Sequence, residues 1–498
     1  MGFAISHVLF YNTCRNLDVF WKDKMSEPGV VKPRITVLNQ GQIEQVHEYS
    51  LKILASTGIQ VVSKRAREIF AGAAGREAVK GDRVRIPREL VEWALKNAPA
   101  AIDVYNRSGD LAFCLGNDRP RFGIGVTNLY YQDPETDRVV PFTRKHMADS
   151  VRLGHALPHY DVVSTVGILQ DISPEIADIY ATLEMAANTV KPLVLLISEE
   201  KCYPVALDLL EHLHGDLSYR PFIIPYFNPI TPLIMNAETT DKMFTTITRS
   251  LPFIYSTYSM AGMSTPITPA GTLALMNAEL LAGLTLSQLI KESTPVILGI
   301  LPAFFDMKTM VSFYDPNSIL LNLACAEMMA FYHLPHCGIS GSGSGWGPDI
   351  LAGETLCMSH LTGCGGKMGL APFVGGNFDS LAFSPTLVVY AHEVIGQSLR
   401  FAGGFQIDDE SAGLKEIDQA GPGGNFLTSK QTARLFRGAY YHSPIFPRLT
   451  LEKWQGQGGP KAADLLRTYT RELMAGLDTP EDYSDTITRG EEFIKGRI

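Results

Sequence analysis

The chain has 498 residues, of which 45% are hydrophobic and 19% are charged, and its formal net charge is -9. This is the composition of an ordinary globular protein with one large domain or two smaller ones. No cluster of Lys and Arg offers a footprint for phosphates, so nucleic acid is not an expected partner.

The cysteines and the amino terminus bear on the cellular compartment. Seven cysteines are scattered without a disulfide framework, which is typical of reduced thiols in the cytoplasm. The first residues, MGFAISHVLFYNTCRNLDVFW, lack the basic start and the small-residue cleavage site of a signal peptide. Residues 1–32 are therefore predicted to be a poorly ordered leader or an artefact of the translation start.

Residues 33–118 are predicted to form a small α+β module. Apolar residues recur on one helical face, and Pro87 suits the first turn of a helix. A Ser-Gly-Asp turn at residues 108–110 between two short apolar runs predicts a hairpin. The expected helices are Gln40–Thr57, Lys64–Ala74 and Pro87–Asn97, and the expected strands are Ile102–Asn106 and Leu111–Leu115.

From residue 119 to residue 403, short apolar runs alternate with helical patterns. Eight strands that alternate with eight helices predict a closed (β/α)8 barrel, a TIM barrel in the α/β class. The expected strands are Phe122–Val126, Asp161–Ile168, Pro192–Ile197, Pro221–Phe227, Pro252–Thr257, Pro295–Ile300, Pro335–Ser340 and Met368–Val374. The expected helices are Arg144–Ala156, Ile176–Asn188, Val205–His214, Thr239–Arg249, Gly271–Lys291, Pro316–Phe331, Ile350–Thr362 and Thr386–Phe401.

Two features accompany this alternation. A hairpin is expected at residues 130–141, within the first unit. A doubly wound open sheet is the rival architecture, but its Gly-rich dinucleotide loop is missing, because Gly123-Ile124-Gly125 is too short and lies inside a strand. Residues 404–498 are predicted to be a C-terminal helical extension that contains an amphipathic helix at Lys461–Leu477.

The stretch from Pro252 to Glu292 contains the most apolar helix of the chain. Thr268 suits the N-cap of this helix, and Pro269 suits its first position. Apolar residues cover nearly every face of the helix, so it is expected to be buried within the protein. Because it contains Asn277, Glu279 and Gln288, a core helix is favoured over a membrane span, and Glu279 is expected to have a buried hydrogen-bonding role.

In a barrel of this kind, function lies on the loops that follow the carboxyl ends of the strands. The residues expected there are strongly aromatic and poor in Lys and Arg. They offer no Schiff-base lysine and no pair of carboxylates on adjacent strands, which argues against an aldolase, a glycosidase or a phosphate substrate. An aromatic rim suits a quaternary ammonium group, which cannot donate hydrogen bonds and is held by cation–π contacts.

Two other patterns near the seventh strand, a set of His and Cys residues and a Gly/Ser loop, each allow two interpretations. His333, His336 and Cys337, with Cys357, His360 and Cys364 nearby, are residue types that bind zinc, but their spacing matches no zinc motif. The Gly/Ser loop at residues 341–347 is able to bind phosphate through backbone N–H groups, or to let a large group approach closely. The lack of a nearby lysine favours the second reading.

The segment from Ser264 to Gly283, STPITPAGTLALMNAELLAG, resembles the signature of the trimethylamine methyltransferase (MttB) superfamily. Further similarities cover the chain from Arg34 to its end and include IEQVHE at residues 43–48, YNRSG at 105–109, TVKP at 189–192, GGNFLT at 423–428 and EKW at 452–454. The resemblance implies a barrel that moves a methyl group from a methylated amine to the cobalt of a separate corrinoid protein. The trimethylamine members carry a pyrrolysine, whereas this chain has only standard residues and is similar to the non-pyrrolysine branch, exemplified by glycine betaine methyltransferase.

The resemblance and the residue pattern together imply a cytoplasmic enzyme without a catalytic side chain, which positions a betaine against a partner's cobalamin. We expect no cofactor or metal bound directly, a cognate corrinoid protein as partner, and no membrane contact; a homo-oligomer is left open. The residues expected to bind the substrate are Tyr105, Tyr131, Phe227, Asn228, Tyr255, Tyr258, Phe305, Trp346 and Asp349. The alternatives are a zinc-dependent methyltransferase or hydrolase on the same barrel and a non-catalytic betaine-binding protein.

Overall fold

A computed structural model describes residues 29–116, 119–339 and 341–497. Eight parallel strands form its centre, in the order β14-β12-β11-β10-β7-β18-β17-β15, and pairing between β14 and β15 closes the sheet into a barrel. This confirms the (β/α)8 barrel and excludes the open sheet. The strands are β7 (Arg121–Ile124), β10 (Val162–Ser164), β11 (Leu193–Leu195), β12 (Ile223–Phe227), β14 (Phe253–Ala261), β15 (Val296–Asp306), β17 (His336–Cys337) and β18 (Leu370–Val374).

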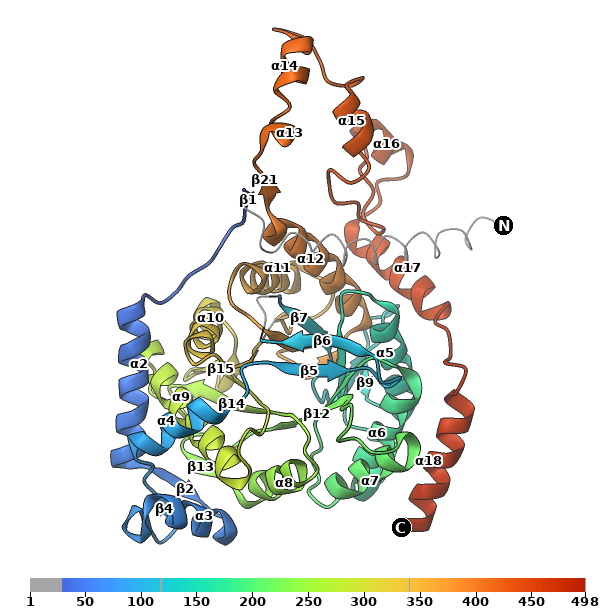
Figure 1. The fold of residues 1–498 in the computed structure, drawn as a ribbon. Helices are drawn as coiled ribbons and strands as arrows, with labels where there is room; N and C mark the ends of the chain where they lie inside the picture. The colour runs from blue at the N-terminus through green and yellow to red at the C-terminus, as the bar shows by residue number, and fades with distance from the viewer. Residues whose placement is uncertain (1–28, 117–118, 340, 498) are drawn as a thin grey trace.

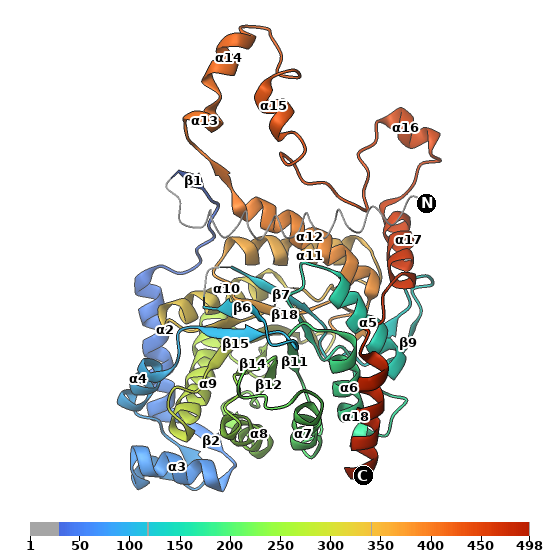
Figure 2. The same cartoon turned by 45° about the vertical axis from the view of Figure 1, so that its right-hand side comes forward.

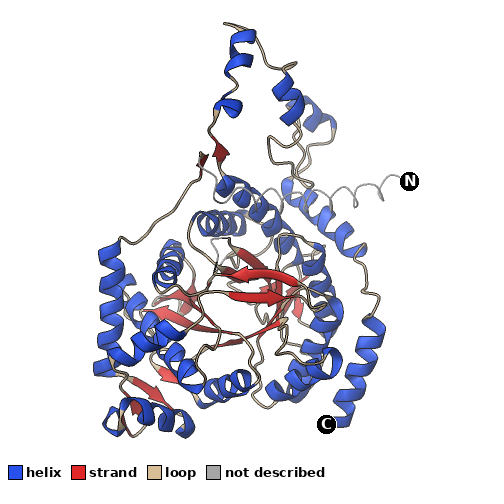
Figure 3. Cartoon of the chain, in the orientation of Figure 1, coloured by secondary structure: helices blue, strands red, loops and turns tan. Residues whose placement is uncertain are grey.

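A ring of helices surrounds these strands (Figure 3). Two of the predicted helices have the expected bounds, and the others differ by a few residues at their ends. The helices are α5 (Arg144–Ala156), α6 (Pro174–Asn188), α7 (Cys202–His214), α8 (Ala237–Thr248), α9 (Pro269–Ile290), α10 (Pro316–Phe331), α11 (Ile350–Gly365) and α12 (Pro385–Gly403).

The N-terminal hairpin closes one end of the barrel. Strands β5 (Ile102–Tyr105) and β6 (Leu111–Leu115) pair antiparallel and lie across the barrel in Figure 1. The Tyr105 N–H donates to the carbonyl of Pro221, which lies two residues before the start of β12. Apolar side chains of the hairpin share one cluster with inward-facing residues of the barrel strands. The hairpin is therefore a plug at the amino ends of the strands, opposite the end where a barrel carries its site.

The rest of the N-terminal module packs on α9. It comprises α2 (Gln40–Lys52), a π-helical turn at Ile53–Thr57, α3 (Lys64–Ala74), α4 (Arg88–Asn97) and a small sheet of β2 (Ile59–Val61), β3 (Val79–Lys80), β4 (Arg83–Val84) and β13 (Ile234–Met235). Pro87 is the N-cap of α4 and not its first helical residue, a shift of one position from the prediction. Apolar residues of the module belong to the same buried cluster as the barrel helices, so the two share one core.

Helix α9 is apolar all round because it is covered all round. One side contacts β14 and β15, and the other contacts α2, α3 and α4. It is the one helix of the described residues whose length and composition would suit a membrane, and 83% of its apolar window is buried inside the protein. Thr268 occupies the N-cap position, as predicted, but its side chain makes no capping hydrogen bond. The Asn277 side chain donates to Ser50 Oγ (2.8 Å) and to the Tyr332 hydroxyl (3.0 Å).

A second, four-stranded sheet lies over the carboxyl ends of the barrel strands. It contains β8 (Tyr130–Gln132) and β9 (Val139–Pro141), which form the predicted hairpin, and also β19 (Gly376–Asn377) and β20 (Ala382–Phe383). The strand β16 (Val311–Phe313) extends the β15 end as a further antiparallel hairpin. Neither β16 nor β19–β20 was predicted, because each has only two or three residues.

The C-terminal region has two parts. Residues 404–460 leave the end of α12 as an arm that projects from the barrel (Figure 2). This arm contains β21 (Phe405–Gln406), α13 (Asp409–Ala412), α14 (Leu414–Ala420), α15 (Lys430–Leu435) and α16 (Leu451–Gly456). The chain then returns as α17 (Ala462–Ala475), which contacts α12 and α5, and α18 (Tyr483–Arg497), which contacts α6 and α7.

The predicted leader falls mostly outside the described residues, which begin at Gly29. Its last part forms the short strand β1 (Val30–Val31), which pairs antiparallel with β21 at the base of the arm. The described cysteines, from Cys114 to Cys364, are all free thiols.

Candidate active site

A cavity of about 210 Å³ opens at the carboxyl ends of the barrel strands. Its floor contains Val126 and Leu301, which also pack against the apolar interior of the barrel. Its volume lies below the range of roughly 300–1,000 Å³ that is usual for drug-sized ligands, so it suits a small metabolite. The remaining apolar lining residues are Ile319, Ile339, Met358 and Phe373.

Aromatic side chains surround one part of this cavity. Tyr314 lines it directly, and burial, followed by the nearby Tyr258, Tyr226 and Asp379, raises the pKa of Tyr314 far above its usual range. Tyr226 lies edge-on to Phe373, with 5.1 Å between the ring centroids. Burial also strongly raises the pKa of Tyr226, so both phenols remain neutral and present uncharged rings.

The charges around the cavity are negative. Asp315 and Glu354 belong to the lining, and the described lining residues include no Lys or Arg. Asp379 is an exposed residue that lies within electrostatic range of Tyr314, and desolvation raises its pKa. Residues 378–380 all have left-handed backbone, with φ of +50°, +51° and +71°. Such strained positions persist where the surrounding structure holds them and gather at functional sites.

Hydroxyl groups form a third part of the lining. Ser342 and Ser380 share a short hydrogen bond, and Ser344 Oγ lies 2.8 Å from Thr355 Oγ1. The Gly/Ser loop that supplies two of these serines packs tightly on α11, because a Cβ at Gly345 would lie 2.3 Å from Asp349 Oδ1. The glycines of this loop were expected to let a large group approach closely. In the structure, the group that lies against Gly345 is the start of helix α11.

None of the nine predicted substrate-binding residues is among the described residues that line the cavity, but two of them lie beside its aromatic residues and a third shares a strand face with one lining residue. Asn228 Nδ2 donates to the Tyr226 hydroxyl over 3.4 Å. Tyr258 shares the inward face of β14 with Ile254, which packs in the barrel interior, and it lies within electrostatic range of Tyr314. Phe305 shares the face of β15 that carries Leu301, but it lies further along the strand, in the β15–β16 hairpin.

Four other predicted residues lie elsewhere. Tyr255 points outward from the barrel against α9, where a Cβ at Gly283 would lie 2.2 Å from its ring. Phe227 packs edge-on against Tyr203 in the layer between strands and helices. Tyr131 is 5% exposed and stacks on His146 at 4.1 Å in the covering sheet. Tyr105 belongs to the plug at the opposite end, so all four are removed from the proposed site.

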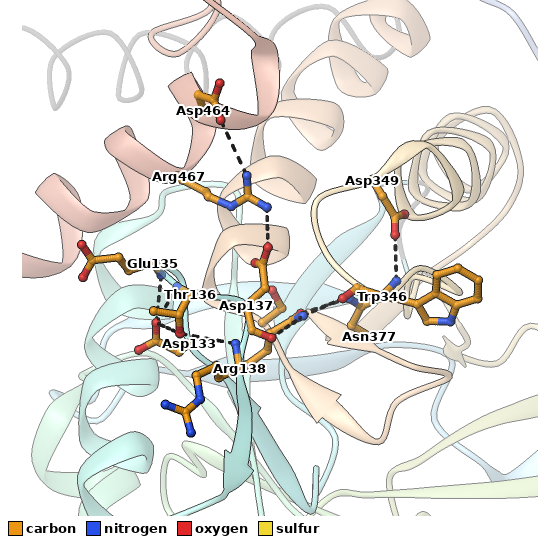
Figure 4. Close-up of polar contacts among 12 residues, drawn as sticks. Asp133, Glu135, Thr136, Asp137, Arg138, Trp346, Asp349, Asn377, Asp464 and Arg467 are labelled. Carbon is orange, nitrogen blue, oxygen red and sulfur yellow. Dashed lines mark hydrogen bonds and ion pairs between the residues drawn. The ribbon is translucent and has the colours of Figure 1, made fainter.

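Trp346 and Asp349 have structural roles at the mouth. The Asp349 carboxylate accepts from the backbone N–H groups of Ala352 (3.0 Å) and Trp346 (2.8 Å), so it caps α11. The Trp346 indole is 67% exposed and points away from these contacts (Figure 4). The Trp346 carbonyl accepts from Gln132 Nε2 (2.7 Å), which ties this loop to the covering sheet.

The contacts in Figure 4 extend to helix α17 of the C-terminal region. Asp137, in the turn between β8 and β9, pairs with Arg467 of α17. The Gln132 side chain also accepts from Asn377 Nδ2 (3.0 Å), in β19. The extension therefore helps to hold the loops at the mouth, a role that sequence reasoning did not assign to it.

The proposed zinc ligands do not converge. His333 is exposed at the turn after α10, whereas His336 and Cys337 are neighbours in β17 and therefore point to opposite faces of the strand. Burial lowers the pKa of His336 to about 3 and raises the pKa of the Cys337 thiol. No group of three or more His, Cys, Asp or Glu suited to a metal occurs within the described parts of the chain. The zinc alternative therefore has no site among them.

Glu279 performs the buried hydrogen-bonding role expected of it. Its carboxylate accepts from Leu233 N (2.6 Å) and Thr231 Oγ1 (2.8 Å), which holds the loop after β12 that begins with Asn228. Burial raises the pKa of Glu279 from 4.5 to about 7, so the unfolded chain releases this proton at a lower pH than the folded protein does. The free energy of unfolding is therefore expected to fall by ~3 kcal/mol as the pH rises from 4.5 to about 7.

Glu279→Gln is expected to remove this part of the pH dependence, because the amide does not ionise. Its oxygen still accepts from Leu233, and its NH2 group donates to the Thr231 hydroxyl. Urea unfolding of both proteins on either side of the window checks the prediction, and identical pH slopes would contradict it.

The model of the trimethylamine methyltransferase (MTTB) family matches residues 21–497. The chain belongs to the trimethylamine methyltransferase family. Glycine betaine methyltransferase of Desulfitobacterium hafniense (strain Y51) is 26% identical over 437 residues, which are 86% of this chain and 90% of that protein. Trimethylamine methyltransferase MttB1 of Methanosarcina acetivorans is 25% identical over 485 residues, which are 93% of this chain and 96% of that protein.

The monomethylamine methyltransferase MtmB of Methanosarcina barkeri is a solved structure with a weaker likeness. Its TM-score is 0.48 at 10% sequence identity, over 94% of this chain and 98% of that one. The family match shows that this chain belongs to a family of methyltransferases. The barrel fold is shown independently by the pairing of its strands.

Proposed function

We propose that this protein transfers a methyl group from a quaternary amine, of the betaine class, to the Co(I) of a separate corrinoid protein. The observation that carries the proposal is the cavity at the barrel mouth, where neutral aromatic rings and carboxylates occur and where the described lining residues include no Lys or Arg. Such a lining favours a cation that donates no hydrogen bond. Family membership and the similarity to a glycine betaine methyltransferase support the same reading.

Methyl transfer from a quaternary amine does not require acid–base catalysis by side chains of the protein. When the methyl carbon leaves, nitrogen keeps the electron pair of the broken bond and departs as a neutral tertiary amine, so no general acid is required. The reduced cobalt of a corrinoid supplies a strong nucleophile. The chain's own residues bind the cation, keep water from it and align one methyl group with the mouth, which is catalysis by positioning. Asn228 and the hydroxyls of Ser342, Ser344 and Ser380 are candidates to hold a substrate carboxylate.

The corrinoid partner would dock on the rim of the mouth. Six large apolar side chains that follow the carboxyl ends of β14, β15 and β17 are exposed, and exposed apolar side chains at one end of a protein favour an interaction site there. These side chains are Met263, Ile267, Met307, Met310, Trp346 and Ile350. The chain has only standard residues, so the proposal places it in the non-pyrrolysine branch, and its cytoplasmic location stays a prediction.

A panel of betaines with free reduced cobalamin tests this function. Consumption of cob(I)alamin, followed by its absorbance, is expected with at least one betaine, together with the demethylated amine by mass spectrometry. Calorimetric binding of a betaine without methyl transfer would instead favour a binding protein. No turnover and no binding across the panel would overturn the proposal.

A further inference from the structure

The carboxylates around the cavity differ in how far the protein itself engages them. The Asp315 carboxylate accepts from the backbone N–H groups of Asn317 (2.8 Å) and Ser318 (3.1 Å), so it caps α10. Glu354 lines the cavity, but it is exposed and its long side chain loses rotamer freedom when it is held over a ligand. Asp379 remains, in the turn between β19 and β20 and next to the lining residue Ser380.

The Asp379 carboxylate has no compensating group within the part of the chain that the structure describes. No hydrogen bond or cation contributes to the shift of its pKa, which desolvation alone raises. The residue is exposed at the mouth, and the protein atoms around its carboxyl group still remove part of its water. A carboxylate that is partly desolvated and unpaired attracts a cation more strongly than one in bulk water does.

The turn holds Asp379 in a fixed place. On one side of it, the Phe378 N–H donates to the Gly345 carbonyl (3.1 Å), and on the other, the Ser380 carbonyl accepts from Asn128 Nδ2 (2.6 Å). The backbone of Asp379 is left-handed, with φ of +51°, a conformation that costs energy and persists because its surroundings impose it. A short side chain on this backbone puts a negative charge within electrostatic range of Tyr314.

We propose that Asp379 is the counter-charge that binds the ammonium group of the substrate, so that the cavity selects amines by their positive charge. This inference rests on the proposed function, because it takes the cavity to hold a quaternary amine. The nitrogen carries a full charge in the bound amine and none once it has kept the electron pair of the broken bond. The Asp379 contact is therefore strongest before methyl transfer and weakest after it. It contributes to substrate binding and product release, and it does not accelerate the chemical step.

Two ligands that differ only in charge test this role by calorimetry, without a corrinoid. Choline and 3,3-dimethylbutan-1-ol have the same shape and hydroxyl group, but a carbon replaces the charged nitrogen in the alcohol. The wild type is expected to bind choline roughly 30-fold more tightly than the alcohol, through the aromatic rings and Asp379 together. Asp379→Asn is expected to raise the Kd of choline by roughly 10-fold and to leave the Kd of the alcohol unchanged.

The asparagine variant suits this test because Asn adopts left-handed backbone more readily than most residues, so the turn is kept. Glu238→Gln is the matched control. It removes one exposed carboxylate in the first turn of α8, at the same end of the barrel but outside the lining, and both Kd values are expected to stay unchanged. With an amine that is turned over, Asp379→Asn is expected to raise KM roughly 10-fold without lowering kcat.

Several outcomes would overturn the proposal. They are a wild type that binds choline no more tightly than the alcohol, a folded Asp379→Asn protein that keeps the full preference, and equal losses for both ligands. Equal losses would mean that Asp379 shapes the cavity and does not pair with a charge. A preference for choline that depends on Asp379, without methyl transfer from any betaine, would count against the proposed function alone. Methyl transfer with an unchanged KM in Asp379→Asn would count against this inference alone.

Discussion

Tyr314→Leu is expected to lower kcat/KM for methyl transfer from a quaternary amine by roughly 30-fold, the equivalent of ~2 kcal/mol. Tyr314 is the aromatic residue that lines the cavity beside Tyr226 and Tyr258, and it is buried enough for its pKa to rise far above its usual range. A cation held against a desolvated ring loses most of this attraction when the ring becomes aliphatic. Initial rates with free cob(I)alamin and the betaine found in the panel check the prediction.

Tyr314→Phe is the first control, because it keeps the ring face and removes only the hydroxyl, and it is expected to stay within a few-fold of wild type. Tyr255→Phe is the second control. Tyr255 packs against Gly283 of α9, outside the cavity, so its rate is expected to be unchanged. If Tyr314→Leu retained the wild-type rate while its fold was intact, the cation would bind elsewhere.

Much of the barrel was predictable because its signals are local. A proline stands one residue before each of β11, β14, β15 and β17, and a proline is the first residue of each of α6, α9, α10 and α12. The apolar pattern changes between the two-residue period of a strand and the helical period from one element to the next. Helices α5 and α10 have the predicted bounds, since Thr143 and Asp315 cap them through their own side chains. The closing β14–β15 pair follows once eight such units are counted, because a closed barrel leaves no edge strand.

The site residues were harder to predict, and β14 shows why. Its sequence offers Tyr255 and Tyr258 as equal aromatic candidates, yet the side chains alternate, so one points to α9 and the other to the interior. In a strand that is buried on both faces, apolar residues occupy both, and hydrophobicity does not reveal which face is inside. Tyr226 was missed for this reason, although its alternation with Phe227 was the available signal.

Other placements depended on contacts between distant segments. Tyr314 follows a three-residue strand that carries no signal of its own, and its place in the cavity is set by the turn back from β16 into α10. Tyr105 was assigned to the site although its hairpin fills the opposite end of the barrel. The sequence of a hairpin that precedes a barrel does not indicate which end of the barrel the hairpin will close.

Gly299→Ala is expected to lower the free energy of unfolding by ~3 kcal/mol, with a matching fall in the melting temperature. Gly299 of β15 pairs with Cys337 of β17, and a Cβ at Gly299 would lie 1.5 Å from the Cys337 carbonyl oxygen and 2.5 Å from its carbon. Because the obstacle is backbone, no change of side-chain rotamer can relieve it, and the two strands must separate. Thermal and urea unfolding, each compared with wild type, measure the loss.

Gly353→Ala is the matched control, since it adds the same methyl group within α11, where the nearest atom is the Tyr390 hydroxyl at 3.5 Å. That contact is ordinary, and alanine favours a helix over glycine, so stability is expected to hold or to rise by up to about 1 kcal/mol. The contrast between the two variants isolates the close approach of β15 and β17. Strand β17 leads directly to Ile339 and Gly341 in the cavity lining, so separating these strands also moves one wall of the site. A Gly299→Ala protein as stable as wild type would mean that the barrel closes without this approach, and the cavity wall would then depend on other contacts.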